Sequence, residues 1–403
     1  KDTDKDFDFQ TDHIQAYIEN GWVKANGTTL GADDGIGVAI IMALLEDKNL
    51  VHGPLEALFT VNEEDGFTGI QGLNSDLLMG DIYINVDSET EGEFTIGSAG
   101  GLNIDARNNY SEERTPAQMA GYKIAIKGLK GGHSGMDINL GRGNAAKILS
   151  RLLWTSQRLF GLRIASFNGG DRYNAIPREA EAVVVVPKSE ADSFSEYVQE
   201  FEATVQKELS TTEPSLAITV ENADLPEKLL GEQSAVNLVS AVYSCPNGVL
   251  RMSDAVPGLV ETSTSMGILK AENGQFWAGF LVRSSLDSAR DDVGNMILSV
   301  FELAGTNASI HDSYSGWAPD PESPILRLMK QVYQDKFGQE PKVAAVHAGL
   351  ETSVIGEKYP GMDMISVGPT LQNVHSPDER LEASTVPKVY ELLTETLMRV
   401  PVN

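Results

Sequence analysis

The chain has 403 residues, of which 41% are hydrophobic and 22% are charged, so it can bury a large core and is expected to form two domains. Acidic residues outnumber basic residues 58 to 31, and the formal net charge is −27, which argues against a nucleic-acid or anionic-membrane partner. The single cysteine, Cys245, permits no internal disulfide, and no apolar run approaches the roughly 20 residues of a membrane span. We therefore expect a cytoplasmic protein.

Apolar strands alternate with amphipathic helices along the chain, which is the pattern of an α/β protein. In the first 100 residues we expect a buried helix at 35–47, a buried strand at 55–61 and a short strand at 81–87. Two more buried strands are predicted at 342–349 and 363–369. Acidic residues and histidines follow the C-terminal ends of these strands, which is the edge where open α/β sheets bind ligands.

The sequence changes character between residues 101 and 316, where an α+β insertion of two comparable parts is predicted. The first part has predicted strands at 122–129, 163–170, 179–187 and 216–222, and helices at 144–160 and 191–209. The second part has predicted strands at 259–269, 276–284 and 308–314, and helices at 235–243 and 291–305. The similarity of the two series suggests a weak structural duplication.

Carboxylates cluster in three short turns: Asp33 and Asp34 in "GADDGIG", residues 63–65 in "TVNEEDG", and Asp87 in "NVDSE". Adjacent carboxylates repel one another, and a divalent cation would offset that repulsion. In an irregular turn one of the two neighbouring glutamates can bind metal while the other faces a bound water as a general base. Any one such turn is more often simply solvated. Four carboxylate or histidine sites at equivalent strand ends favour a metal-dependent hydrolase.

The ordered motifs of the chain carry a resemblance to a known family. They are "LGADDGIG", "TVNEEDG", "NVDSE", "KGGHSG", "DRYNAIPRE", "HAGLE" and "VGPTLQNVHSPDE". Over essentially its whole length the chain resembles the bacterial aminoacyl-histidine dipeptidases, carnosinase-like members of the co-catalytic zinc exopeptidases. The resemblance implies an α/β catalytic domain with a mixed sheet flanked by helices, formed by residues 1–100 and 317–403. An α+β lid domain of two parts, residues 101–316, would interrupt it.

The resemblance also implies a site with two zinc ions, for which manganese or cobalt could substitute, that share one carboxylate and one water. Asp33 matches the bridging carboxylate, Glu64 and His375 match ligands of one metal, and Asp87 matches a ligand of the other. Glu63 matches the catalytic glutamate, which takes a proton from the metal-bound water and passes it to the leaving amine. A cis peptide bond after Asp33 is implied as well.

Three residues of the lid match positions that act on the substrate. His133 of "GGHSG" matches the histidine that supports the developing oxyanion. Asn174 and Arg283 match substrate-holding positions, and the planar guanidinium would pair with the substrate's C-terminal carboxylate in two hydrogen bonds. Without the resemblance, His133 would more often be a surface-loop residue and Arg283 an ordinary salt-bridged arginine. His347 matches no ligand, and we expect it to be a supporting or hydrogen-bonded core residue.

These residues predict a metallodipeptidase that hydrolyses Xaa-His dipeptides such as β-alanyl-histidine by attack of a zinc-bound hydroxide. Its partner would be a small dipeptide, with no nucleic acid and no membrane, and the protein would be a monomer or a homodimer. With both lid parts in one chain, all site residues could come from the same chain. The alternatives are an N-acyl amino acid deacylase or carboxypeptidase of the same fold, or a non-catalytic peptide- or amino-acid-binding relative.

One motif of the family has no match. In the family, a histidine from a His-x-Asp motif upstream of the bridging aspartate is the remaining ligand of the other metal. His13 is the only histidine before Asp33 in the given sequence, and no aspartate stands two residues after it. We therefore expect that a first segment carrying this motif is missing from the chain as given, which makes the second metal doubtful if the protein truly starts at Lys1.

A protein that begins at Lys1 is expected to bind at most one zinc ion tightly, to be poorly active, and to expose core that the first segment would cover. The reason is that Asp33 and Asp87 alone form a weak site of oxygen ligands. A protein that contains the segment should bind two metals and cleave β-alanyl-histidine. Metal analysis alongside intact mass decides, and two tightly held zinc ions in a chain proven to start at Lys1 would contradict the expectation.

Overall fold

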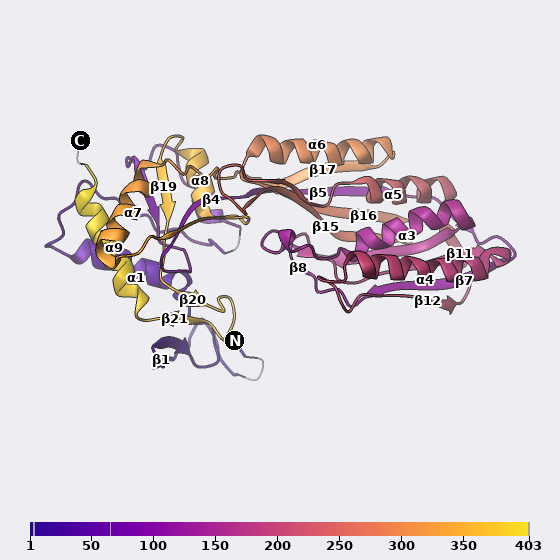
Figure 1. The fold of residues 1–403 in the computed structure, drawn as a ribbon, viewed down its shortest axis with the longest axis horizontal. Coiled ribbons are helices and arrows are strands. Elements are labelled where there is room, and N and C mark those ends of the chain that lie inside the picture. The colour runs from indigo at the N-terminus through magenta and orange to yellow at the C-terminus, as the bar shows by residue number, and fades with distance from the viewer. Residues whose placement is uncertain (3–4, 65, 402–403) are drawn as a thin grey trace. The chain divides into compact units, whose positions relative to one another are not determined.

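The computed structural model describes residues 1–2, 5–64 and 66–401, and these form two compact units (Figure 1). Unit 1 consists of Lys1–Ser98, Trp317–Val346 and Leu350–Asn403, and unit 2 consists of Ala99–Gly316 and His347–Gly349. Asp65, one of the clustered acidic residues, lies outside the described residues. Within the described chain, none of the helices combines the length and apolar character that crossing a bilayer requires.

Unit 1 is built around a four-stranded mixed sheet with the order β18-β4-β19-β3. The β18–β4 and β19–β3 pairs are parallel, whereas β19 runs antiparallel to β4. The strands are β3 (Ile82–Asn85), β4 (Glu93–Ser98), β18 (Lys342–Val346) and β19 (Asp363–Ser366). Side chains of successive strand residues point to opposite faces, and on β19 Ile365 and Met364 belong to separate hydrophobic clusters.

Helices cover both faces of this sheet. Ile365 shares its cluster with side chains of α1 (Ala32–Glu46), α7 (Pro324–Phe337) and α9 (Thr385–Arg399). Met364 shares its cluster with side chains of α2 (Thr68–Gln71) and α8 (Glu351–Lys358). The expected mixed sheet flanked by helices is therefore confirmed.

A second sheet of unit 1 joins the two ends of the chain. Its order is β1-β2-β21-β20, and all its pairs are antiparallel. The strands are β1 (Ala16–Glu19), β2 (Trp22–Ala25), β20 (Leu371–Gln372) and β21 (Arg380–Glu382). The loop between β20 and β21, residues 373–379, is held at both ends by this pairing.

Two predictions for unit 1 need correction. The strand predicted at 55–61 is wrong, because a strand exists only where a neighbour accepts its backbone hydrogen bonds, and no described strand pairs with this segment. The predicted helix at 35–47 forms as α1, but it is buried along one face only. Its opposite face carries the exposed apolar side chains of Val38, Met42 and Leu45.

Unit 2 contains a nine-stranded antiparallel sheet whose main path is β12-β7-β11-β9-β15-β16-β5-β17, with β14 paired to β15. The strands are β5 (Gly100–Asn109), β7 (Met119–Lys127), β9 (Arg163–Asp171), β11 (Ala180–Pro187), β12 (Ala217–Ala223), β14 (Gly248–Met252), β15 (Val260–Glu272), β16 (Gln275–Ser284) and β17 (Asn307–Tyr314). The helices are α3 (Ala145–Phe160), α4 (Ala191–Glu208), α5 (Glu232–Ser244) and α6 (Asp287–Leu303). Two short pairs complete the unit, β6 (Glu112–Arg114) with β13 (Lys228–Leu230) and β8 (Gly132–His133) with β10 (Ala175–Ile176).

The order of elements in unit 2 shows a duplicated topology. The series β7-α3-β9-β11-α4-β12 and β5-α5-β15-β16-α6-β17 have the same succession of strands and helices. Counted from the outer edge of the sheet toward its middle, each series contributes its fourth, first, third and second strand in that order. The two halves meet where their second strands, β9 and β15, pair antiparallel. This matches the duplication that the sequence suggested, and the first half is inserted after the first strand of the second half.

All four long helices of unit 2 contribute to one core, together with inward side chains of the sheet. Figure 1 shows these helices running beside the strands. On β5, Leu102 and Ile104 belong to this core, whereas Asp105 and Arg107 alternate with them and face the other way. One face of the sheet is therefore apolar and covered by helices, and on β5 the opposite face is polar.

Candidate active site

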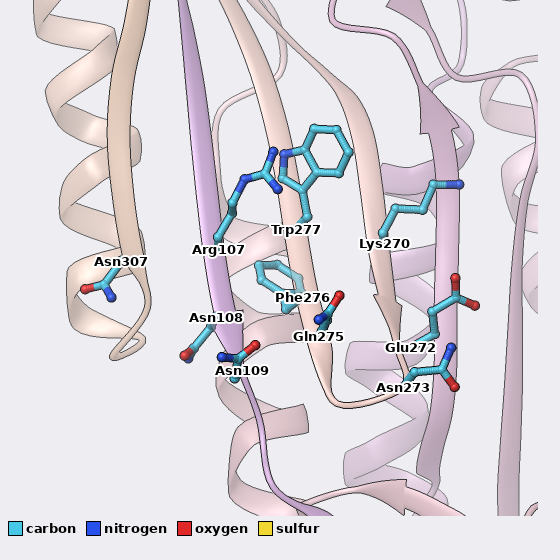
Figure 2. A pocket seen from close by; sticks show the side chains of 10 residues that line it. All are labelled: Arg107, Asn108, Asn109, Lys270, Glu272, Asn273, Gln275, Phe276, Trp277 and Asn307. Carbon is cyan, nitrogen blue, oxygen red and sulfur yellow. The ribbon is translucent and has the colours of Figure 1, made fainter.

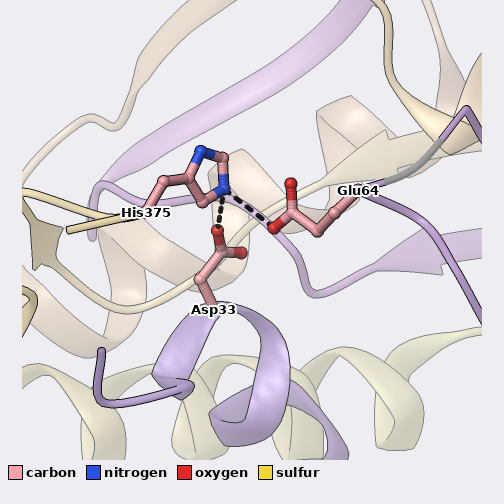
Figure 3. A group of neighbouring side chains, drawn as sticks. All are labelled: Asp33, Glu64 and His375. Carbon is pink, nitrogen blue, oxygen red and sulfur yellow. Dashed lines mark hydrogen bonds and ion pairs between the residues drawn. The ribbon is translucent and has the colours of Figure 1, made fainter. Parts of the chain in front are cut away.

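The first turn of α1 carries Asp33 and Asp34, which are joined by a cis peptide bond, as predicted. Asp34 accepts a hydrogen bond from the Gly37 backbone at 2.9 Å, so its carboxylate is turned onto its own helix. Asp33 instead faces His375 and Glu64 (Figure 3).

His375, Asp33 and Glu64 converge from three separate parts of unit 1 (Figure 3). His375 Nε2 lies 3.1 Å from Asp33 Oδ2 and 2.8 Å from Glu64 Oε1. One ligand atom of each residue lies within 4.8 Å of the other two. Asp33 comes from the start of α1, Glu64 from the turn before α2, and His375 from the β20–β21 loop. These three predicted ligands are therefore brought together by the fold.

Asp87 and Glu63 complete an anionic cluster around the same point. Asp87 follows β3, and burial together with the nearby charges of Asp34 and Asp33 raises its pKa to about 10. Burial and then Glu64 raise the pKa of Glu63 to about 7. Burial also raises the pKa of Asp34 to about 7. The carboxylates thus disfavour one another's charge at short range.

A divalent transition metal fits this set of side chains. Two carboxylates and one imidazole are ligands that zinc, manganese and cobalt all accept, and the separation of their atoms matches one ion between them. The attraction of a positive ion would also offset the repulsion between the buried carboxylates. Asp87 and Asp33, with Asp34 beside them, provide oxygen ligands next to the first group.

In unit 2, His133 lies on β8 and pairs with Ala175 of β10. Its Nδ1 accepts hydrogen bonds from the backbone amides of Gly135 at 3.1 Å and Met136 at 3.0 Å. In the neutral ring the proton must therefore be on Nε2. Burial and then the charge of Arg283 lower the pKa of His133, which favours this neutral form. The result is a neutral N–H donor, which suits a developing oxyanion.

Arg283, on β16, is only 5% exposed, yet no carboxylate pairs with it among the described residues. Its Nη1 donates to the Tyr314 hydroxyl at 3.2 Å, and its buried Nε has no hydrogen-bond partner in the part of the chain that the structure describes. A buried guanidinium remains charged and requires an anion. The alternative of an ordinary salt-bridged arginine is therefore not supported by the described contacts.

Asn174 lies in the turn before β10, and its backbone carbonyl accepts a hydrogen bond from Ser134 at 2.9 Å. The segments of His133 and Asn174 therefore run side by side. The neighbouring Tyr173 donates its hydroxyl to Asp105 at 2.6 Å, and Trp277 donates to the same carboxylate oxygen at 2.6 Å. Asp105 and Trp277 belong to the second half of unit 2, so this half anchors the Asn174 segment of the first.

His347 is buried, and its Nε2 lies 2.7 Å from the Ser263 hydroxyl. The expected hydrogen-bonded role of this histidine is therefore confirmed. Asp34, one of the clustered carboxylates that the sequence pointed out, shares the buried cluster. Glu379 was not singled out by the sequence, and it contacts the backbone at and before Asp33. The "SPDE" motif contains Glu379, but nothing in its sequence indicates the distant partner.

A polar pocket of about 580 Å³ on unit 2 contains none of the predicted site residues (Figure 2). In it the Arg107 guanidinium lies 4.2 Å from the centre of the Trp277 ring. The lining residues are Arg107, Asn108, Asn109, Lys270, Glu272, Asn273, Gln275, Phe276, Trp277 and Asn307.

Comparison of the chain with known proteins identifies its family. Residues 2–399 match the profile of Peptidase family M20/M25/M40. The chain belongs to this peptidase family. Its members are metal-dependent enzymes, which agrees with the convergence of Asp33, Glu64 and His375.

Two relatives match this M20 peptidase over its whole length. The "Cytosol non-specific dipeptidase" of Escherichia coli (strain K12) is 41% identical over 401 residues, which are 100% of this chain and 83% of the relative. The crystal structure of "Aminoacylhistidine Dipeptidase from Vibrio alginolyticus" is 40% identical with a TM-score of 0.95, and the match covers 100% of this chain and 82% of that one. The "Uncharacterized protein YqjE" of Bacillus subtilis (strain 168) is 29% identical over 212 residues, 51% of this chain and 50% of its own.

Zinc is expected to stabilise the metal-free M20 peptidase, because a cation relieves the repulsion among the carboxylates. A ligand at 100 times its dissociation constant adds about 2.7 kcal/mol to the free energy of unfolding. His375→Ala should largely abolish the zinc-dependent rise in melting temperature. His52→Ala is the matched control, because His52 is exposed and its Nδ1 lies 2.6 Å from the neighbouring Gly53 carbonyl. Thermal melts with zinc and with a chelator measure this, and an equal zinc response in both variants would contradict the assignment.

Proposed function

We propose that this M20 peptidase is a metal-dependent dipeptidase of the cytosol whose substrates include Xaa-His dipeptides such as β-alanyl-histidine. The observation that carries the proposal is the convergence of Asp33, Glu64 and His375 beside Glu63. The substrate class follows from the two relatives of full-length similarity, one named a non-specific dipeptidase and the other an aminoacylhistidine dipeptidase.

Asp33, Glu64 and His375 would hold one zinc ion, and Asp33 would share a second with Asp87. Manganese or cobalt would suit the same ligands. When bound, such ions supply Lewis acidity that polarises a carbonyl group and acidifies water. Glu63 would accept the proton of the attacking water, because its carboxylate stands directly beside the proposed ligand Glu64. The same carboxyl group would then return the proton to the leaving amine.

Unit 2 would act as the lid and hold the substrate. The His133 Nε2 proton would be donated to the carbonyl oxygen as negative charge develops on it, which stabilises the transition state more than the ground state. Arg283 would pair with the C-terminal carboxylate of the dipeptide, the anion that its buried guanidinium lacks among the described residues. Asn174 would add a hydrogen bond to the substrate backbone. Because one chain carries both halves of the lid, a monomer or a homodimer would have complete sites.

Glu63→Gln should lower kcat for β-alanyl-histidine by about 10²–10⁴-fold, since the amide cannot accept the proton of water. The parent protein with zinc should turn over this dipeptide and lose activity on chelation. Metal content of the variant, measured on the same preparation, should stay at the parent level. Faster cleavage of acetylated amino acids than of dipeptides would favour the deacylase alternative, and no metal-dependent turnover of either would refute the proposal.

Arg283→Lys should raise KM for β-alanyl-histidine by about tenfold or more, because one point charge replaces a two-pronged hydrogen bond to the carboxylate. The C-terminal amide of the same dipeptide lacks the carboxylate and should be cleaved equally by parent and variant. Arg327→Ala removes an exposed arginine of α7 and should leave both rates unchanged. Equal losses on the acid and the amide would show that Arg283 does not recognise the carboxylate.

A further inference from the structure

Glu379 is a buried carboxylate that connects two distant parts of unit 1. It is 2% exposed and lies at the end of the β20–β21 loop, four residues after His375. Its partners are four consecutive backbone amides 346 to 349 residues away. Oε2 accepts from Leu30 at 2.7 Å and Gly31 at 3.0 Å, and Oε1 accepts from Ala32 at 2.8 Å and Asp33 at 3.3 Å.

Three of these amides, those of Gly31, Ala32 and Asp33, are donors at the N-cap and first positions of α1, and Leu30 directly precedes them. The first N–H groups of a helix have no partner within the helix, and a side chain near the N-cap usually accepts from them. Here the N-cap is Gly31, which has no side chain and lies in the left-handed region at φ 72°. Glu379 therefore takes the place of the local cap, and its negative charge lies at the favourable end of the helix.

Only a carboxylate meets the requirements of this position. An ionised carboxylate offers about four acceptor positions and no donor, whereas a glutamine amide presents two N–H groups of its own. Glu379 has no lysine or arginine partner among the described residues, and its charge contributes to raising the pKa of the nearby Glu89. An additional buried anion in an already anionic neighbourhood is unfavourable, so its hydrogen bonds to the backbone must compensate.

The other end of Glu379 is fixed to the loop of His375. The Glu379 backbone amide donates to the Ser376 carbonyl at 3.1 Å, and the Ser376 hydroxyl in turn accepts from Asp378. His375 has a positive φ of 61°, which an L-residue rarely adopts, so its loop needs such support. One side chain thus links the turn that presents Asp33 to the loop that presents His375.

We propose that Glu379 is a positioning residue for the metal site, which holds Asp33 and His375 at the distance that a divalent cation needs. It touches neither metal nor substrate in this role and acts through the backbone of residues 30–33. The inference rests on the metal site of the proposed function. It extends that function by assigning the coupling between two ligands from opposite ends of the chain to one carboxylate.

The test compares Glu379→Gln with Glu382→Gln. Both convert one carboxylate to an amide within seven residues of His375, but among the described residues the Glu382 side chain accepts a hydrogen bond from the Ser384 hydroxyl alone. The zinc dissociation constant, measured by competition with a coloured chelator, should rise by about 10- to 100-fold in Glu379→Gln and stay unchanged in Glu382→Gln. The visible spectrum of the cobalt-loaded protein should also change in Glu379→Gln only, since it reports the geometry of the ligands.

A purely structural role would lower the melting temperature of the metal-free protein while the zinc affinity and cobalt spectrum stay at the parent values, and that result would overturn the inference. If Glu379→Gln does not fold, Glu379→Asp carries the same test. It keeps the charge but shortens the side chain by one methylene, so the dissociation constant should still rise, and an unchanged value would overturn the inference. A parent protein that binds no zinc would instead refute the proposed metal site itself, before any variant is compared.

Discussion

The mutual repulsion of buried carboxylates is the constraint on which unit 1 depends. Asp33, Asp34, Glu63 and Asp87 lie close enough that each disfavours the charge of another, and burial of Asp34, Glu63 and Asp87 adds to this cost. Such a cluster persists only if the backbone holds it rigidly and a cation offsets its charge. On the backbone side, the turn that leads into Asp33 is held by its hydrogen bonds to Glu379.

Unit 2 has the complementary chemistry. Its Arg283 is a buried cation without a described anion, and the neutral His133 beside it offers a proton donor. The net charge of −27 would repel an anionic peptide from afar, but salt screens that effect beyond about 8–10 Å. Recognition of a carboxylate therefore depends on the local guanidinium and not on the field of the whole protein.

The sequence predicted most of unit 2 correctly because its elements have strong, regular hydrophobic patterns. The predicted strand at 179–187 and helix at 144–160 appear as β11 and α3 with shifts of one residue. The strand at 55–61 failed because strand formation depends on a neighbour, which an apolar run does not reveal. The candidate metal ligands Asp33, Glu64 and His375 were predicted through short motifs and the family resemblance that they carry. Glu379 was missed because its role depends on backbone amides that are distant in sequence and carry no side-chain signature.

The duplication of unit 2 places the proposed substrate-binding residues in two similar halves, with His133 and Asn174 in the first and Arg283 in the second. In the second half, β15 and β16 are joined by the tight turn Asn273–Gly274, whose residues both have positive φ, as a two-residue hairpin requires. The equivalent connection of the first half, between β9 and β11, is longer and carries Asn174.

Two glycines of the second half make room for this longer connection. A Cβ on Gly267 would lie 2.1 Å from the Arg172 carbonyl, and one on Gly279 would lie 2.9 Å from the Tyr173 ring. The second half therefore keeps a minimal hairpin of its own and provides the glycines and Asp105 that seat the Asn174 segment of the first. Because each half depends on the other, the two are no longer interchangeable copies, and their sequences can diverge while their topology stays the same.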